Sequence, residues 1–290
     1  MTKVPVSVIV PVKNEAPNME RCLSNLAWAD EVFVVDSQSA DGTVETAARL
    51  GATVVQFRFN GVYPKKKNWS LENLPLRNEW VLIVDADEVI PPDLQAQIAE
   101  TVRAPDADGY YLHFTYMFLG RKIRHCGYAS LWVLRLFRHK LGRYEKMPVT
   151  PGSRTGDNEA HEHVILEGTT RRLPGSVLHY AYPSIDAWVE KHNRYSNWEA
   201  ELYSQFVAGG FRSGEQHMDG TRRLKRRVKV LYLRLPFRYV LRFFYHYVIR
   251  LGFLDGKPGF ILCGLLGFYE FLSWSKVYER RLAERKEAVE

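Results

Sequence analysis

The sequence predicts an α/β fold with a mostly parallel sheet, followed by a helical segment that associates with membranes. Two observations predict the sheet: strand-like and helix-like stretches alternate from residue 6 to residue 85, and strands such as "VSVIV" and "VLIV" are apolar at almost every position. Strands covered by helices on both faces have this composition. A basic, aromatic composition after about residue 210 predicts the second part, so we expect domains at 1–210 and 211–290.

Seven elements follow one another in the first part of the chain. The expected strands are Val6–Val12, Glu31–Asp36, Thr53–Phe57 and Trp80–Asp85, and the expected helices are Met19–Leu26, Thr43–Leu50 and Lys65–Asn73. The turn "SADGT" marks the start of the second helix. Further on, "LRLFRH" and "VILEG" are expected to be strands, and Ile185–Phe206 a helix.

Composition and cysteine content are typical of a globular intracellular protein. The chain has 290 residues, of which 46% are hydrophobic and 25% charged, so it can bury a full core. The cysteines Cys22, Cys126 and Cys263 are far apart and form no C-x-x-C pair, which argues against a disulfide framework or a zinc site. The apolar run at the N-terminus is too short for a signal peptide, so we expect the body to stay in the cytosol.

Polar clusters follow three of the strands, where ligands of such sheets bind. They are "PVKNE", "DSQSADGT" and "DADE". Asp85 and Asp87 repel each other unless a cation lies between them, and their oxygens are suitable ligands for Mg²⁺ or Mn²⁺. The alternative is a polar strand end whose acids cap the next helix. Asp36 and Glu15, at the ends of neighbouring strands, favour the metal.

The same stretches resemble the nucleotide-sugar half of glycosyltransferase family 2, the inverting enzymes with a GT-A fold. The matching motifs are "VSVIVPVKNE", "VVDSQSADGT", "KKKNW" and "WVLIVDADE". Later motifs resemble the bacterial subgroup that includes lipopolysaccharide core β-glucosyltransferases: "FLGRKIRHCG", "LRLFR", "HEHV", "LHYAY", "KHNRYSNWEAELY" and "GFLDGKPGFILC". The resemblance runs from about Pro5 to Trp274.

The resemblance implies a set of donor-binding residues. It places Pro11, Asn14 and Glu15 at the nucleoside, Asp36 at the uracil edge, Lys67 near the base or diphosphate, Asp85 near the ribose or metal, and Asp87 on the metal. The metal would neutralise charge that develops on UDP as the glycosidic bond breaks. Asp36 could instead be a turn residue, and Lys67 a solvated charge.

An inverting transfer also needs a general base. Many family members use an Asp within an "ED" pair, which this chain lacks in the expected region. Glu162 of "HEHV" is the best positional match, with a structural salt bridge as the alternative. The other candidates are Asp157, Glu159, His161 and His163.

Three further residues are candidates for contacts with phosphate or metal. Arg135 and Arg138 should face opposite sides of their strand, and one of them could bind a phosphate of donor or acceptor, or both could pair with surface acids. His179 is either a third metal ligand, a diphosphate contact or a core histidine.

Acceptor contacts are less defined. Arg121 and His125 lie in a loop that could frame the acceptor, and Lys191 and Arg194 flank the helix Ile185–Phe206 and could face an anionic headgroup. This helix carries an aromatic stripe that is either core or a sugar platform: Trp188, Val189, Tyr195, Trp198, Leu202 and Phe206.

The basic segment accounts for the whole charge surplus. Between Arg212 and Arg250 there are 11 Lys/Arg against 2 Asp/Glu, compared with +7 for the chain. Arg238, Arg242, His246 and Arg250 recur every four residues and should form a cationic ridge beside apolar side chains, as in a helix lying on an anionic membrane. A solvated basic face and nucleic-acid binding are alternatives. The apolar run Gly259–Ser275 is short for a span, which favours an interfacial or re-entrant segment.

These observations lead to one expected function and two alternatives. We expect metal-dependent transfer of a hexose from a UDP-sugar to a lipid-linked or lipopolysaccharide-core acceptor at the cytoplasmic face of the inner membrane, with no role for nucleic acid. The sugar and the acceptor stay open. A phosphatase of the haloacid-dehalogenase type, with Asp85 and Asp87 as nucleophile and acid/base, would also place D-x-D after an apolar strand, although three strands precede it here. The second alternative is a membrane-peripheral binding protein without turnover.

Overall fold

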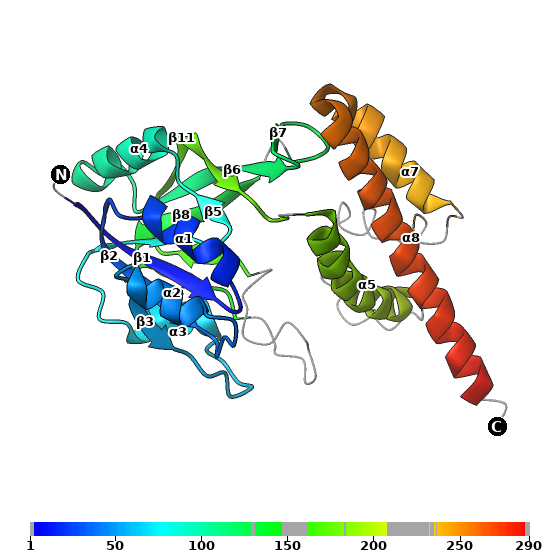
Figure 1. Ribbon diagram of the computed structural model, residues 1–290, viewed down its shortest axis with the longest axis horizontal. Coiled ribbons are helices and arrows are strands. Elements are labelled where there is room, and N and C mark those ends of the chain that lie inside the picture. Colours follow the sequence, from blue (N-terminus) through cyan, green and yellow to red (C-terminus); the bar gives the residue numbers. More distant parts are fainter. Residues whose placement is uncertain are drawn as a thin grey trace. The chain divides into compact units, whose positions relative to one another are not determined.

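The computed structural model describes residues 3–128, 131–146, 162–182, 184–207, 232, 235 and 237–287 (Figure 1). The chain forms two compact units. The first comprises Met1–Tyr116 and Ser130–Ala181, and the second comprises Met117–Ala129 and Tyr182–Glu290. The division near residue 181 differs from the expected domain boundary at 210, because the helix after residue 184 belongs to the second unit.

A large mixed sheet forms the first unit. Its strands are β1 (Val4–Val12), β2 (Ala29–Asp36), β3 (Thr53–Gln56), β4 (Trp80–Ile83), β5 (Glu88–Val89), β6 (Gly109–Phe118), β7 (Arg121–Ile123), β8 (Trp132–Arg138) and β11 (Thr170–His179). They lie in the order β3-β2-β1-β4-β8-β6-β11-β5, and β7, which pairs with β6, belongs to the second unit. The pairs β1–β2, β1–β4, β2–β3 and β6–β11 are parallel, which confirms the predicted fold class.

Helices cover both faces of the parallel part. They are α1 (Ala16–Asn25), α2 (Thr43–Arg49), α3 (Lys66–Asn73) and α4 (Pro92–Arg103). One apolar cluster joins the sheet to α1, α2 and α4, and a second joins the other face to α3 and the hairpin of β9 (Gly142–Tyr144) and β10 (Val164–Leu166). Val8 and Val10 belong to the first cluster and Ile9 to the second, as the alternation of side chains along a strand requires. Polar side chains therefore gather beyond the strand ends.

The seven elements expected before residue 85 are all present, with ends shifted by a few residues. Helix α1 begins at Ala16 rather than Met19 because Pro17 fits in the first helical turn, where its missing N–H has no partner to lose. Strand β4 ends at Ile83, so Asp85 and Asp87 lie in the loop that follows.

The second unit is mostly helical. It contains α5 (Ile185–Val207), α7 (Arg238–Phe244), the π-helix η2 (Tyr245–Ile249), the 3₁₀-helix η3 (Gly252–Asp255) and α8 (Gly256–Glu287). Helix α8 packs against both α5 and α7. By length and composition the stretch Gly252–Ala283, which includes η3 and most of α8, could cross a membrane, but 44% of its most apolar part is buried within the protein.

The cationic ridge expected on the outside of the basic helix is wrong in its orientation. Arg238 and Arg242 both pair with the buried Glu270 of α8, and His246 Nδ1 lies 2.7 Å from the Cys126 carbonyl oxygen. Arg238, Arg242 and His246 therefore face inward, and the apolar side chains beside them face outward. Residues 211–231 of the basic segment lie outside the described residues.

The aromatic stripe on α5 is divided. Trp188 is fully buried and stacks on His192 at 3.6 Å between ring centroids, whereas Tyr195 is exposed. The side chains of Trp198, Leu202 and Phe206 lie outside the described residues. Lys191 lies 5.3 Å from the ring centroid of Tyr182.

Candidate active site

The loops after β1 and β2 are held together by side-chain hydrogen bonds. The backbone N–H of Asn14 donates to Ser39 Oγ at 2.7 Å, and the backbone N–H of Ala40 donates to the side-chain Oδ1 of Asn14 at 3.0 Å. The Glu15 amide donates to Thr43 Oγ1 at 2.9 Å. These bonds fix the ends of both strands as one rim, to which Pro11 of β1 contributes a half-buried ring.

Asp36 lies at this rim but is turned into the protein. Its side chain is 1% exposed and accepts hydrogen bonds from the Ser39 amide and from Gln56 Nε2, both at 3.0 Å. These contacts match those of a turn residue, which the sequence left open as an alternative. Its contact with uracil stays a prediction.

Asp85 is held by two cations. Arg135 Nη2 lies 2.7 Å from its Oδ2, and Lys67 Nζ lies 3.6 Å from its Oδ1. Burial opposes ionisation of Asp85, but Arg135 and Lys67 outweigh it and hold the pKa of this carboxyl well below its usual range. Lys67 is itself buried, so the alternative of a solvated charge is wrong.

Glu88, to which the sequence reasoning gave no role, connects the parts of this loop. Its Oε2 accepts the Asp85 amide at 2.9 Å, and its Oε1 accepts Arg135 Nη2 at 2.9 Å. Burial raises the pKa of Glu88 to about 8, against the opposing effect of Arg135. One guanidinium thus contacts two carboxyl groups, Asp85 and Glu88. The spacing of three residues between Asp85 and Glu88 was the feature of the sequence that could have indicated this contact.

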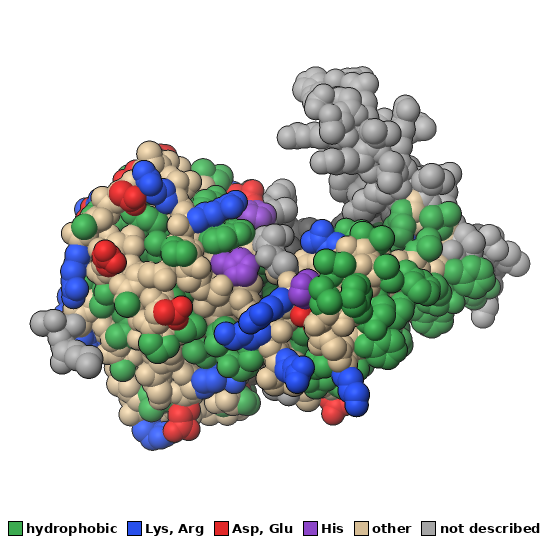
Figure 2. Space-filling model, turned by 90° about the horizontal axis from the view of Figure 1, so that it is seen from above, with side chains coloured by type: hydrophobic (Ala, Val, Ile, Leu, Met, Phe, Trp, Pro, Cys, Tyr) green, Lys and Arg blue, Asp and Glu red, His purple; other side chains and the backbone are tan. Residues whose placement is uncertain are grey.

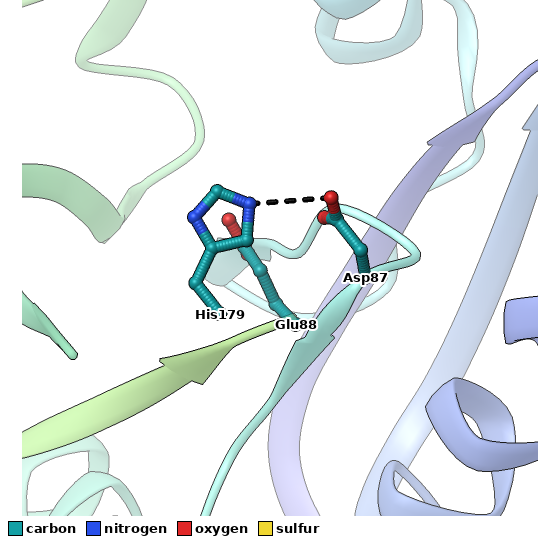
Figure 3. A group of neighbouring side chains, drawn as sticks. All are labelled: Asp87, Glu88 and His179. Atoms are coloured by element: carbon teal, nitrogen blue, oxygen red, sulfur yellow. Dashed lines mark hydrogen bonds and ion pairs between the residues drawn. The ribbon is translucent and has the colours of Figure 1, made fainter. Parts of the chain in front are cut away.

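Asp87 and His179 face each other at the end of the sheet (Figure 3). Pairing of β5 with β11 sets Glu88 opposite His179, and His179 Nε2 lies 3.2 Å from Asp87 Oδ2. Burial lowers the pKa of His179, but the hydrogen bond with Asp87 outweighs it and raises the pKa overall. His179 Nδ1 is buried without a hydrogen-bond partner in the described part of the chain.

This group has the composition of a divalent-cation site. One ligand atom each from Asp87, Glu88 and His179 lies within 4.8 Å of the others. Carboxylate oxygens and an imidazole nitrogen suit Mn²⁺, and the carboxylates also suit Mg²⁺. Asp85 is not part of the group, because its two oxygens already face Arg135 and Lys67.

Arg138 is not brought to this site. It pairs with Glu79 and with Asp108, whose Oδ1 lies 3.3 Å from Arg138 Nε. Because β8 runs antiparallel to β4, Arg138 lies opposite Trp80 at the start of β4, and Arg135 lies near the end. Of the two arginines, only Arg135 is placed to meet a ligand here.

Glu162 forms an ion pair with Lys65, and both side chains are largely buried. The salt bridge that was the alternative to a general base is therefore present, and the role as base stays a prediction. His163 Nδ1 lies 2.9 Å from Glu145 Oε1. Asp157, Glu159 and His161 lie outside the described residues.

The family model and a sequence relative both indicate one family. Residues 7–163 match the model of glycosyl transferase family 2. An uncharacterized glycosyltransferase of Rickettsia conorii is 30% identical, with 97% of this chain and 92% of that protein covered. A lipopolysaccharide core biosynthesis glycosyltransferase, LpsC, of Rhizobium meliloti is 25% identical, with 99% of this chain and 97% of that protein covered. Among solved structures, S. aureus TarS 1–349 in complex with UDP-GlcNAc aligns with a TM-score of 0.46 and 14% identity, over 99% of this chain and 92% of that one.

Proposed function

Because the chain belongs to glycosyltransferase family 2, we propose that it transfers a hexose, with inversion, from a UDP-sugar to a lipid-linked or lipopolysaccharide-core acceptor. Its sheet has the GT-A arrangement predicted from the sequence, with the candidate site where the parallel strands end. Family membership also removes support for the phosphatase alternative, since the matched region includes Asp85 and Asp87.

The observation that carries the donor site is the Asp87–His179 pair beside Arg135. Asp87 and His179 would hold Mg²⁺ or Mn²⁺, with Glu88 close by, and the bound ion would neutralise the diphosphate leaving group. Arg135 keeps Asp85 and Glu88 in place and has Nε and Nη1 buried without hydrogen-bond partners in the described part of the chain. These donors and the Lys67 ammonium supply positive charge where a diphosphate would lie.

The rim formed by Pro11, Asn14 and Glu15 supports nucleoside binding, because its loops are fixed before a ligand arrives. Glu162 is the proposed base that takes the proton from the acceptor hydroxyl. Its pairing with Lys65 holds the carboxylate in one position, as a base requires.

The acceptor and the location are proposed from the relative and the chain together. The Rhizobium protein is named for lipopolysaccharide core biosynthesis, and this chain has a long apolar helix with many basic residues near it. We place transfer at the cytoplasmic face of the inner membrane.

The test is turnover of UDP-hexoses with Mn²⁺ or Mg²⁺, followed as release of UDP. Asp87→Ala should abolish metal-dependent release, a loss of at least about a hundredfold given the weight of charge stabilisation in such sites. Asp93→Asn is the matched control, because this acid is exposed on α4 outside the site. Full activity in Asp87→Ala, or no release with any UDP-hexose, would contradict the proposal.

A further inference from the structure

A continuous apolar surface covers α7, η2, η3 and α8, and we name it the aromatic face. Six of its side chains are between 48% and 68% exposed: Leu241, Phe244, Ile249, Leu254, Phe260 and Tyr278. Figure 2 shows hydrophobic side chains gathered over this part of the second unit. Soluble proteins rarely leave an apolar patch of this extent open to water.

Ring contacts join the helices within this surface. Phe243 contacts both Phe244 and Phe260, with centroids at 5.4 and 5.8 Å. Tyr247 contacts Phe260 and Phe253, at 5.6 and 6.2 Å. The exposed rings of α7, η3 and α8 therefore form one surface rather than separate spots.

One end of the aromatic face is strongly basic. Residues 117–129 and 245–260 contain five cations, namely Arg121, Lys122, Arg124, Arg250 and Lys257. The one acid in these ranges, Asp255, is largely buried, and it accepts hydrogen bonds from the Arg124 and His125 amides at 3.1 and 2.8 Å. Asp255 is thus bound to backbone amides, and the five cations outnumber it.

We propose that the aromatic face lies in the interfacial layer of a bilayer rich in anionic lipids, with these cations at the lipid phosphates. The combination of exposed aromatic rings and a basic rim fits such a surface. A second copy of the chain is a poorer occupant, because a symmetric contact would bring the two basic ends into one interface. Membrane binding would give the protein access to a lipid-linked acceptor, and this explanation rests on the proposed function.

The same contacts argue that α8 lies on the membrane and does not cross it. The side of α8 opposite the aromatic face packs on α5 and includes polar contacts: Lys276 Nζ donates to the Asn193 carbonyl oxygen at 2.8 Å, and Ser273 Oγ donates to Glu199 at 3.0 Å. A crossing would carry these groups and the buried Glu270 into hydrocarbon, at a cost that an interfacial position avoids.

Flotation of the full chain with vesicles tests the proposal without any donor or turnover. The full chain should float with vesicles of phosphatidylcholine and phosphatidylglycerol, and much less with phosphatidylcholine alone. The variant Phe253→Ser/Leu254→Ser/Phe260→Ser should bind at least about tenfold more weakly, because three apolar side chains no longer enter the membrane. The variant Lys122→Glu/Arg124→Glu/Lys257→Glu should lose the preference for anionic lipid.

The matched control is Val62→Ser/Ile165→Ser, which removes two side chains that are 59% and 62% exposed in the first unit. It should float like the unchanged chain, and melting curves should show all variants folded. Equal flotation of every variant would overturn the proposal. So would a dimer that the serine variants convert to monomer, which would assign the face to a second copy, and so would retention in alkaline carbonate, which would indicate a span. UDP release without vesicles reports on the proposed function separately.

Discussion

At the level of single residues, the two arginines of β8 have different surroundings, although the sequence gave both the same candidate role. Arg135 lies between two carboxyl groups and is 7% exposed, whereas Arg138 pairs with acids at the other end of the strand. Alternation predicted that the two would face different sides. It could not predict which end of β4 each would meet, because that depends on the antiparallel register of β8.

Arg135→Met should therefore be far more damaging than Arg138→Met. Removing the guanidinium leaves Asp85 and Glu88 facing each other, and we expect the free energy of unfolding to fall by about 3 kcal/mol with loss of turnover. Arg138→Met removes partly exposed ion pairs and should cost less than about 1 kcal/mol. Urea titration and UDP release measure both effects. Equal losses in the two variants would contradict the role given to Arg135.

Variants of Lys65 and Glu162 distinguish two roles of Glu162, that of a general base and that of a partner in a structural salt bridge. If Glu162 takes the acceptor proton, Glu162→Gln should lower kcat about a thousandfold, in the range usual for such groups, with KM for the donor unchanged. Lys65→Met should lower kcat much less, because the carboxylate remains. A bridge with only a structural role would instead give both variants the same loss of stability and near-normal kcat.

Sequence reasoning named Asp87 and His179 as candidate ligands, but not the partners that fix their positions. Polar residues at strand ends can be recognised from pattern alone, and Asp87 was found in this way. Glu88 was missed because its two hydrogen bonds reach the Asp85 amide, three residues away, and Arg135, which is distant in sequence. Contacts of the second kind depend on sheet order, which a single sequence does not specify.

At the level of elements, the basic helix shows what periodicity can and cannot tell. The spacing of four residues predicted that the cations lie on one side of the helix. It does not indicate whether that side faces the solvent or the interior of the protein. The deciding partner, Glu270, lies 28 residues from Arg242 on another helix. With both arginines paired to Glu270, the surface left for a membrane is the apolar one.

Helix α5 carries a pH-sensitive contact at His192. Burial lowers the pKa of His192 to about 4, so the folded state holds the neutral ring where the unfolded chain would be protonated. The resulting stability is complete above about pH 6.5 and is lost as the pH falls from there toward 4. Between pH 7 and pH 5 the loss should be about 2 kcal/mol.

The check compares urea titrations of the unchanged chain with His192→Phe at both pH values. Phenylalanine keeps a ring against Trp188 but cannot be protonated. Between pH 7 and pH 5, the free energy of unfolding of the unchanged chain should therefore fall by about 2 kcal/mol more than that of His192→Phe. Other titrating groups are common to both chains and cancel. A difference that is the same at pH 7 and pH 5 would show that His192 is not the sensitive group.

For the whole molecule, the boundary expected at residue 210 was inferred from a change in composition, whereas the two compact units are defined by contacts within the structure. The chain leaves the first unit after residue 116 and returns to it at residue 130, and the segment between belongs with α8 to the second unit. Cys126 Sγ lies 3.5 Å from Cys263 Sγ, and His125 Nδ1 lies 3.1 Å from Asp255. Such an excursion within a sheet gives no compositional signal.

A chain ending at residue 210 should therefore behave poorly despite its complete sheet. It keeps residues 117–129 but lacks the residues of η3 and α8 that contact them, so Cys126 and Ile123, both buried in the full chain, become exposed. We expect this truncation to aggregate. A chain that ends at residue 181, and so also lacks α5, and that has residues 119–129 replaced by a short Gly-Ser loop should be a monomer, because β6 and β8 are antiparallel neighbours that a short loop can join. Size exclusion, with a thermal shift by UDP and Mn²⁺ as the sign of an intact donor site, measures both chains. If the plain truncation were as soluble and as stable as the shortened one, the contacts of residues 117–129 with α8 would not matter to folding, and the compositional boundary would be the better division of the molecule.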